Sequence, residues 1–352
     1  MTTETLDIDA RARGCLLGGA VGDALGAATE FYSLARIREQ FGPDGIRDLV
    51  PAYGMRGAIT DDTQMTLFTA EGLIRARSVL AEREFVLPGE QVRRAYLRWL
   101  DTQGHLPLRL PSGVTRLSLL DGWLIEQPFL HHRRAPGHTC LSALSNPNAS
   151  PWAENWSKGC GGLMRMAPAG LAAVEGTFDD SFLTGVQCAH LTHGHPTGHL
   201  AAGAFAVMIE RLARGEALAD AVDAGKRALE GDEGRETVRA IEAAERLAAE
   251  GDPSAEKVES LGAGWVAEEA LSISVYCAMV ADDYESAVLL AVNHSGDTDS
   301  TGSITGNLVG AMYGPGAIPE RWLDELEGRE VIERVAIDLV SDEVDVERYP
   351  PS

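Results

Sequence analysis

The sequence predicts an all-α fold, and two observations support that prediction. Apolar residues recur at helical spacing along most of the 352-residue chain, and almost no stretch alternates apolar and polar residues as a half-buried strand does. Two segments, near the start and near residue 300, also place a glycine at every fourth position. That spacing aligns the glycines on one narrow stripe of a helix.

Composition indicates a soluble globular enzyme with a well-buried core, because 45% of the residues are hydrophobic and 38 are glycine. The formal net charge of −23 disfavours binding to nucleic acid or to an anionic membrane, which would repel such a chain. The length allows one large domain or two ordinary ones.

The cysteines and the start of the chain bear on the cellular compartment. Five cysteines without paired spacing are typical of free thiols in a reducing compartment, and not of a disulfide framework or a zinc site. The first ten residues show no secretory signal, and no run of about 18 apolar residues predicts a membrane span. We therefore expect a cytoplasmic protein.

The first predicted helix, residues 10–31, carries the first glycine stripe, formed by Gly14, Gly18, Gly22 and Gly26. Such a bare surface lets another helix approach closer than the usual axis separation of about 8–10 Å. Asp23 lies inside this helix and is expected to be a buried polar partner for a neighbouring helix end. Glu30 lies at the end of this stretch, just past the helix itself, and, judged alone, is expected at the surface.

A second helix is predicted to follow the loop at 50–59. Thr60 is a good N-cap residue, and Asp61 and Asp62 suit the positive end of the helix dipole. Met65, Leu67, Phe68, Leu73 and Ile74 then recur at helical spacing. Taken alone, the two aspartates indicate only the start of a helix.

The middle of the chain is less regular. An amphipathic helix is predicted at 90–100, and the proline-rich segment 101–155 is expected to be mostly loop and to line a binding site. The histidines of this region have no metal-like spacing and are expected to be solvated: His105, His131, His132 and His138. The glycine-rich turn at 157–162 either presents backbone N–H groups to an anion or is simply a tight turn.

Helical patterns fill the next hundred residues. Within 178–213, a break at 191–196 holds His193, which either contacts a ligand or satisfies a buried carbonyl. Residues 213–258 are rich in Ala, Glu, Arg and Asp and predict a solvated helical hairpin at the periphery. Residues 265–293 predict two apolar helices.

The second glycine stripe, Gly302, Gly306, Gly310 and Gly314, predicts a buried helix over 296–314. Each glycine inside a helix costs about 1 kcal/mol relative to alanine, so four of them indicate close approach of another backbone. Asp297, Asp299 and Ser300 stand at the start of this helix. Short helices are predicted at 320–326 and 331–339.

The two acidic helix starts, at residues 61–62 and 297–300, have the same composition and would form one site if the fold joins them. Carboxylates and hydroxyls without histidine or thiolate favour Mg²⁺, Mn²⁺ or Ca²⁺ over zinc. The sequence therefore predicts a site for a divalent cation between two helix ends.

Five motifs in order identify a resemblance. They are GGAVGDALG (18–26), TDDT (60–63), SKGCGGLMR (157–165), LTH (191–193) and GDTDS (296–300). Together they resemble the ADP-ribosylglycohydrolase family, which includes dinitrogenase reductase-activating glycohydrolases and ADP-ribosylarginine and ADP-ribosylserine hydrolases. The motifs run from about residue 10 to 314, and the helices expected at 318–340 follow them.

The resemblance implies one all-α domain, residues 1–352, built as a compact orthogonal helix bundle around two divalent cations, Mg²⁺ or Mn²⁺. It implies the metal ligands Thr60, Asp61, Asp62, Asp297, Asp299 and Ser300. The catalytic residues it implies are Asp61, Asp62, Asp299 and Glu30. Ser157, Gly159, Cys160 and Gly161 would line the diphosphate pocket, and His193 would lie near the distal ribose. Lys158 replaces an aromatic residue, and Cys160 an asparagine, of some members.

The activity implied is hydrolysis of the bond between ADP-ribose and an acceptor, an arginine or serine side chain of a protein. Two alternatives stay open: cleavage of small ADP-ribosyl compounds, and a non-catalytic relative that only binds ADP-ribose. Acidic residues at all five matching carboxylate positions favour an enzyme: Glu30, Asp61, Asp62, Asp297 and Asp299.

Overall fold

The computed structural model describes residues 7–82, 86–105, 110, 115–146, 152–174, 176, 178 and 180–351. Four of the prolines that mark the segment 101–155 as a loop, those at 107, 111, 147 and 151, lie outside these residues. Within the described residues there is no β-strand, and only two isolated bridges occur, Ala52 with Met55 and Gly159 with Val266. The predicted all-α fold is confirmed.

The first half of the chain forms α1 (Ile8–Gly26), α2 (Leu34–Phe41), α3 (Asp61–Glu82), α4 (Pro88–Thr102), α5 (Arg116–Leu119), η1 (Leu124–Glu126), η2 (Pro128–His131), α6 (His138–Ser145), η3 (Cys160–Gly162) and α7 (Ala167–Val174). The second half forms α8 (Ser181–His190), α9 (Pro196–Ala213), α10 (Leu218–Ala228), α11 (Arg235–Ala249), α12 (Ala255–Glu259), α13 (Ala267–Val280), α14 (Tyr284–Ala291), α15 (Thr298–Tyr313), η4 (Pro315–Ala317), α16 (Glu320–Leu323) and α17 (Arg329–Val340).

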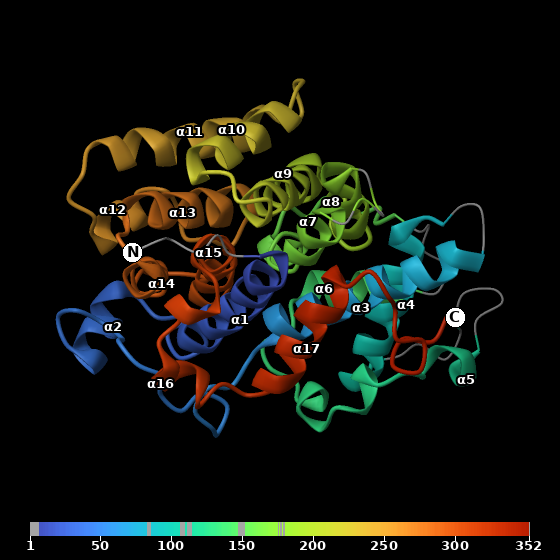
Figure 1. Cartoon of the computed structure of the whole chain (residues 1–352). Helices are drawn as coiled ribbons and strands as arrows, with labels where there is room; N and C mark the ends of the chain where they lie inside the picture. Colours follow the sequence, from blue (N-terminus) through green and yellow to red (C-terminus); the bar gives the residue numbers. More distant parts are fainter. Residues whose placement is uncertain are drawn as a thin grey trace.

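The two glycine-rich helices, α1 and α15, lie side by side at the centre of the molecule (Figure 1). Their stripes face each other. A Cβ atom added at Gly22 would lie 2.0 Å from the carbonyl oxygen of Gly302, and one added at Gly306 would lie 2.1 Å from that of Gly18. Only glycine permits this approach, which confirms the predicted reason for both stripes.

The remaining helices surround this pair. Helix α3 packs against α4 and α17, and α13 and α14 flank α15 (Figure 1). The predicted hairpin at 213–258 consists of α10 and α11 at the edge of the molecule, with α11 packed on α13 (Figure 1). The predicted helix at 320–326 is shorter than expected, because α16 ends at Leu323.

The five cysteines are free, as their spacing predicts. Among the helices that the structure describes, none is both long enough and apolar enough to cross a membrane.

Candidate active site

Three helix ends converge beside one cavity and bring five carboxylates together. Glu30 follows α1, Asp61 and Asp62 open α3, and Asp297 and Asp299 stand at the start of α15. We call these five residues the acidic cluster. Each is at most 8% exposed. The predicted convergence of the two acidic helix starts is therefore what the structure shows, with Glu30 added to it.

The cavity has a volume of about 180 Å³. The acidic cluster and Ser300 form one wall. The rest is formed by part of the 101–155 segment, the glycine-rich turn, His193 and Trp265. Part of the segment expected to line a binding site thus lines this cavity. The lining residues are Glu30, Asp61, Asp62, Ala135, Gly137, Thr139, Cys140, Gly159, Cys160, Gly161, Met164, His193, Trp265, Asp297, Asp299 and Ser300.

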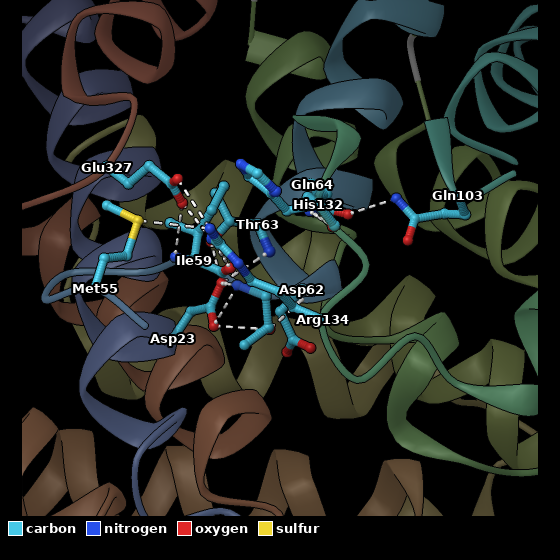
Figure 2. Close-up of polar contacts among 11 residues, drawn as sticks. Asp23, Met55, Ile59, Asp62, Thr63, Gln64, Gln103, His132, Arg134 and Glu327 are labelled. Atoms are coloured by element: carbon cyan, nitrogen blue, oxygen red, sulfur yellow. Dashed lines mark hydrogen bonds and ion pairs between the residues drawn. The ribbon is translucent and has the colours of Figure 1, made fainter. Parts of the chain in front are cut away.

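Asp23 fixes the start of α3. Its carboxylate accepts hydrogen bonds from the backbone N–H groups of Thr60 (3.0 Å) and Thr63 (3.1 Å) and from the Thr60 hydroxyl (2.8 Å). Figure 2 shows Asp23 beside Thr63 at this helix start. Because free N–H groups at a helix start need acceptors, Asp23 stabilises the turn that carries Asp61 and Asp62. The expectation of a buried polar partner is confirmed, and Thr60 lies beside the cluster with its hydroxyl bonded to Asp23.

Arg134 holds the loop before α3 without neutralising the cluster. Its guanidinium donates to the carbonyl oxygen of Ile59 at 2.8 Å and is paired with Glu327 (Figure 2). The backbone N–H of Asp61 donates to the Arg134 carbonyl at 3.3 Å. The positive charge of Arg134 is thus matched outside the acidic cluster.

Glu30 corrects an expectation, because taken alone it was placed at the surface and it is in fact buried. The chain turns inward after α1. The Thr29 hydroxyl lies 3.1 Å from the carbonyl oxygen of Gly26 and 3.0 Å from that of Val292. Phe31 then adopts a φ of 66° and donates its N–H to the carbonyl oxygen of Gly296. These long-range contacts, which the local sequence does not reveal, direct Glu30 into the cavity.

The electrostatics of the cluster are those of uncompensated negative charge. Burial, and then the charges of Asp299 and Asp297, raise the pKa of Glu30 to about 11. Burial and the charge of Asp299 likewise hold the pKa values of Asp61 and Asp62 well above the ordinary range. In the part of the chain that the structure describes, no lysine or arginine forms an ion pair with any of the five carboxylates.

The same carboxylates have the chemistry of a cation site. Three carboxylate oxygens lie within 4.8 Å of one another, one each from Glu30, Asp297 and Asp299. Glu30 Oε2 and Asp62 Oδ1 are buried and lack a hydrogen-bond partner. Buried carboxylate oxygens that cluster in this way, beside others that lack a hydrogen-bond partner, fit a hard divalent cation.

The glycine-rich turn also lines the cavity, next to the acidic cluster. The Cys160 thiol donates to Asp297 Oδ2 at 2.7 Å, so the turn contacts the acidic cluster directly. The Cys160 backbone N–H donates to the Trp265 carbonyl at 3.1 Å. Ser157 lies just outside the lining residues and accepts the Gly159 N–H at 3.3 Å. Lys158 is paired with Glu236 and Glu268, on α11 and α13, and is therefore not directed at the cluster.

His193 reaches the cavity from the break between α8 and α9. It is 1% exposed, and burial together with the nearby Arg165 charge lowers its pKa to about 3. By contrast, the histidines at 105, 131, 132 and 138 are exposed, as predicted, although His131 ends η2 and His138 begins α6.

Comparison with known proteins places these observations in a family. A family model described as ADP-ribosylglycohydrolase matches residues 4–348. The chain belongs to the ADP-ribosylglycohydrolase family. As a member, it is a glycosidic-bond hydrolase.

Named relatives of this glycohydrolase match over most of their length. An ADP-ribosyl-[dinitrogen reductase] glycohydrolase of Rhodospirillum rubrum is 28% identical over 90% of each chain. The ADP-ribosylarginine hydrolase Tri1 of Serratia proteamaculans is 25% identical over 96% of this chain and 80% of its own. A solved structure, the ADP-ribosylglycohydrolase-related protein complex, superposes with a TM-score of 0.70 at 26% identity, covering 95% of this chain and 98% of that one.

Two residues in or behind the site of the glycohydrolase, Trp265 and Arg165, are not predicted by the sequence. Trp265 lines the cavity and stacks on Phe31, with ring centroids 5.3 Å apart. Arg165 is fully buried behind His193 and was noticed only as the last residue of a motif. No periodicity or spacing marks either residue, because each is recruited by contacts between distant segments.

Proposed function

We propose that this glycohydrolase is a metal-dependent enzyme that hydrolyses the bond between ADP-ribose and an arginine side chain of a protein, releasing ADP-ribose. The observation that carries the proposal is the acidic cluster. Its carboxylates are buried without a cationic partner among the described residues, and they line one cavity together with a glycine-rich turn and a histidine. A protein that buries this much unmatched negative charge is built to hold cations.

The proposed ligands of two Mg²⁺ or Mn²⁺ ions are Thr60, Asp61, Asp62, Asp297, Asp299 and Ser300. All six offer oxygen atoms, which these hard cations prefer. When bound, such ions would neutralise the acidic cluster and act as Lewis acids on a water and on ribose hydroxyls.

The other proposed roles belong to the chain's own side chains. Asp61, Asp62, Asp299 and Glu30 would form the catalytic set, in which Glu30 stands on a non-helical segment with one oxygen free of any hydrogen bond. That oxygen can accept a proton from an attacking water or orient the water toward the anomeric carbon. The negative field of the cluster would also stabilise an oxocarbenium-like transition state.

The remaining cavity residues would bind the rest of ADP-ribose. Ser157, Gly159, Cys160 and Gly161 are proposed to surround the diphosphate, and His193 is proposed to contact the distal ribose. Cys160 also ties this wall to the acidic cluster through its bond to Asp297. A shift of the turn would therefore move Asp297, one of the proposed metal ligands.

Arginine is the favoured acceptor for two reasons. Its guanidinium is cationic, and a chain of net charge −23 attracts cationic groups. One relative is named an ADP-ribosylarginine hydrolase. Serine linkages and small ADP-ribosyl compounds are the alternatives. The five free cysteines fit a reducing compartment such as the cytoplasm.

The test measures free ADP-ribose released from arginine-linked and serine-linked ADP-ribosyl peptides, with Mg²⁺, Mn²⁺ or EDTA. We expect release from the arginine-linked peptide with either metal and none with EDTA. Release from the serine-linked peptide alone would change the acceptor. Full activity in EDTA would contradict the metal centre. Tight ADP-ribose binding without release of any kind would favour a non-catalytic relative.

A further inference from the structure

Thr192 lies between a buried cation and the histidine of the cavity. The Arg165 guanidinium is fully buried, and its Nη2 donates to Thr192 Oγ1 at 2.6 Å. The same oxygen lies 2.8 Å from His193 Nδ1. Among the described residues no carboxylate pairs with Arg165, whose other contacts are two sulfur atoms and the face of an aromatic ring, on Met65, Cys140 and Tyr96.

The direction of the hydrogen bonds at Thr192 can be worked out. A guanidinium only donates, so Thr192 Oγ1 accepts from Arg165 and keeps its own proton to give elsewhere. The carbonyl oxygen of Ala189 lies 3.4 Å away and already accepts the backbone N–H groups of Thr192 and His193, at 3.1 and 3.0 Å. A carbonyl oxygen has two lone pairs, so it is occupied. Cys140 Sγ, the other acceptor near Thr192, is a weak one and already receives Arg165 Nη1 at 3.4 Å. The Thr192 hydroxyl therefore donates to His193 Nδ1.

This assignment fixes the state of the imidazole. A ring nitrogen that accepts a hydrogen bond carries no proton, so neutral His193 carries its proton on Nε2. The field of Arg165 favours the same arrangement, because a cation beside Oγ1 polarises the hydroxyl as a donor. Burial of His193 beside that cation also favours the neutral ring.

The Nε2 edge of the ring is the one that faces the cavity. A Cβ atom added at Gly159 or Gly161 would lie 3.4 or 3.5 Å from His193 Nε2, and both glycines line the cavity. Nδ1 is turned toward Thr192 at the back. A donor at Nε2 would accordingly point at whatever occupies the space beside the glycine-rich turn.

We infer that Thr192, polarised by Arg165, is a positioning residue that fixes His193 as the neutral Nε2–H tautomer, a hydrogen-bond donor to the ligand. The hydrogen-bond partner that His193 Nε2–H selects in the ligand is an acceptor oxygen of a ribose hydroxyl or a phosphate. The identity of that ligand rests on the proposed function, whereas the tautomer itself rests on the hydrogen bonds alone.

The decisive experiment is long-range ¹H–¹⁵N correlation NMR of the full-length, ligand-free protein at neutral pH, with the His193 signals assigned by comparison with His193→Gln. We expect the protonated ring nitrogen to couple to both ring C–H protons, which identifies it as Nε2. An Nδ1-protonated ring, or a doubly protonated one, would overturn the inference. The tautomer is measured on the wild-type protein, and the His193→Gln variant serves only to assign the signals.

A matched pair of variants tests the positioning role. Thr192→Val removes the hydroxyl at nearly constant shape, and we expect the Nδ1-protonated form to appear in its spectrum. Thr192→Ser keeps the hydroxyl and should retain the wild-type pattern. If Thr192→Val is folded by circular dichroism and still shows only Nε2–H, Thr192 does not set the tautomer.

Calorimetric titration with ADP-ribose links the tautomer to binding. Loss of one neutral hydrogen bond is expected to weaken the affinity of Thr192→Val by about three- to tenfold, with Thr192→Ser near wild type. If the wild-type protein does not bind ADP-ribose, the proposed function fails while the tautomer stands. If the wild type binds ADP-ribose and Thr192→Val binds equally well, the donor role of His193 is wrong.

Discussion

Helix α3 carries two buried groups of charged residues, of which one has ion-pair partners and the other has none among the described residues. At its start, Asp61 and Asp62 join the acidic cluster, in which no cation pairs with the carboxylates among the described residues. About 15 Å along the same helix, Glu71 is equally buried, but its two oxygens accept from Arg75 at 2.9 Å and from Arg98 at 2.8 Å.

Further contacts complete the paired group, which consists of Glu71, Arg75 and Arg98. Arg75 also contacts Asp121 Oδ1 at 2.8 Å, and Arg98 donates to the carbonyl oxygen of Leu119 at 3.3 Å. Two carboxylates thus face two guanidinium groups. Buried charge is tolerated when partners of opposite sign accompany it, so the contrast teaches that the acidic cluster is incomplete without something cationic. The paired group stabilises the fold, whereas the acidic cluster is left to bind a cation.

The largest expected effect separates these two roles. Asp299→Asn keeps the shape of the side chain but removes a proposed ligand charge. We expect ADP-ribose release to fall about a thousandfold, equivalent to about 4 kcal/mol of lost transition-state stabilisation. The urea midpoint of the metal-free variant should not fall, since one of several repelling charges is gone. Activity within tenfold of wild type would contradict the catalytic role.

The next effect concerns the paired group and should show the reverse pattern. Glu71→Gln leaves two buried guanidinium groups short of a counter-charge, and we expect the free energy of unfolding to drop by about 3–5 kcal/mol. Urea denaturation measures this drop, and the folded fraction should keep its specific activity. Glu256→Gln, in the exposed pair with Arg38, is the control and should leave the midpoint unchanged. Equal midpoints for the two variants would mean that the paired group does not stabilise the fold.

The smallest effect concerns a third way to bury an ionisable group, which is to leave it uncharged. His294 is fully buried between Ser295 and Thr301, its nearby acid is Glu259, and burial lowers its pKa to about 4.

Below pH 6.5 the unfolded chain binds a proton at this histidine that the folded chain does not. Stability should therefore fall as the pH drops from about 6.5 to 4, by about 1.4 kcal/mol per pH unit for this residue. Urea midpoints measured across that range should fall less steeply for His294→Asn than for the wild type. Parallel slopes would show that His294 is charged in the folded protein.

The positions of several helices and the close approach of two of them can be predicted from local sequence. Backbone geometry places residues four apart on one face of a helix, so the glycine stripes of α1 and α15 predicted both helices and their close approach. The sequence equally predicted the start of α3 with its two acids, and the exposure of the histidines at 105, 131, 132 and 138. The extent of a single domain over residues 1–352 stays a prediction.

The tertiary structure decided which of these elements meet. Asp62, on α3, and Asp297, before α15, are more than two hundred residues apart. They share a cavity because α1 packs against α15 through its glycines and holds the start of α3 through Asp23. The burial of Glu30 depends on contacts that Thr29 and Phe31 make with the segment before α15. Sequence periodicity carries no information on such pairings, because they depend on which helix faces pack together. For the same reason, the hydrogen bond between Arg165 and Thr192 cannot be predicted from the sequence and is revealed only by the tertiary structure.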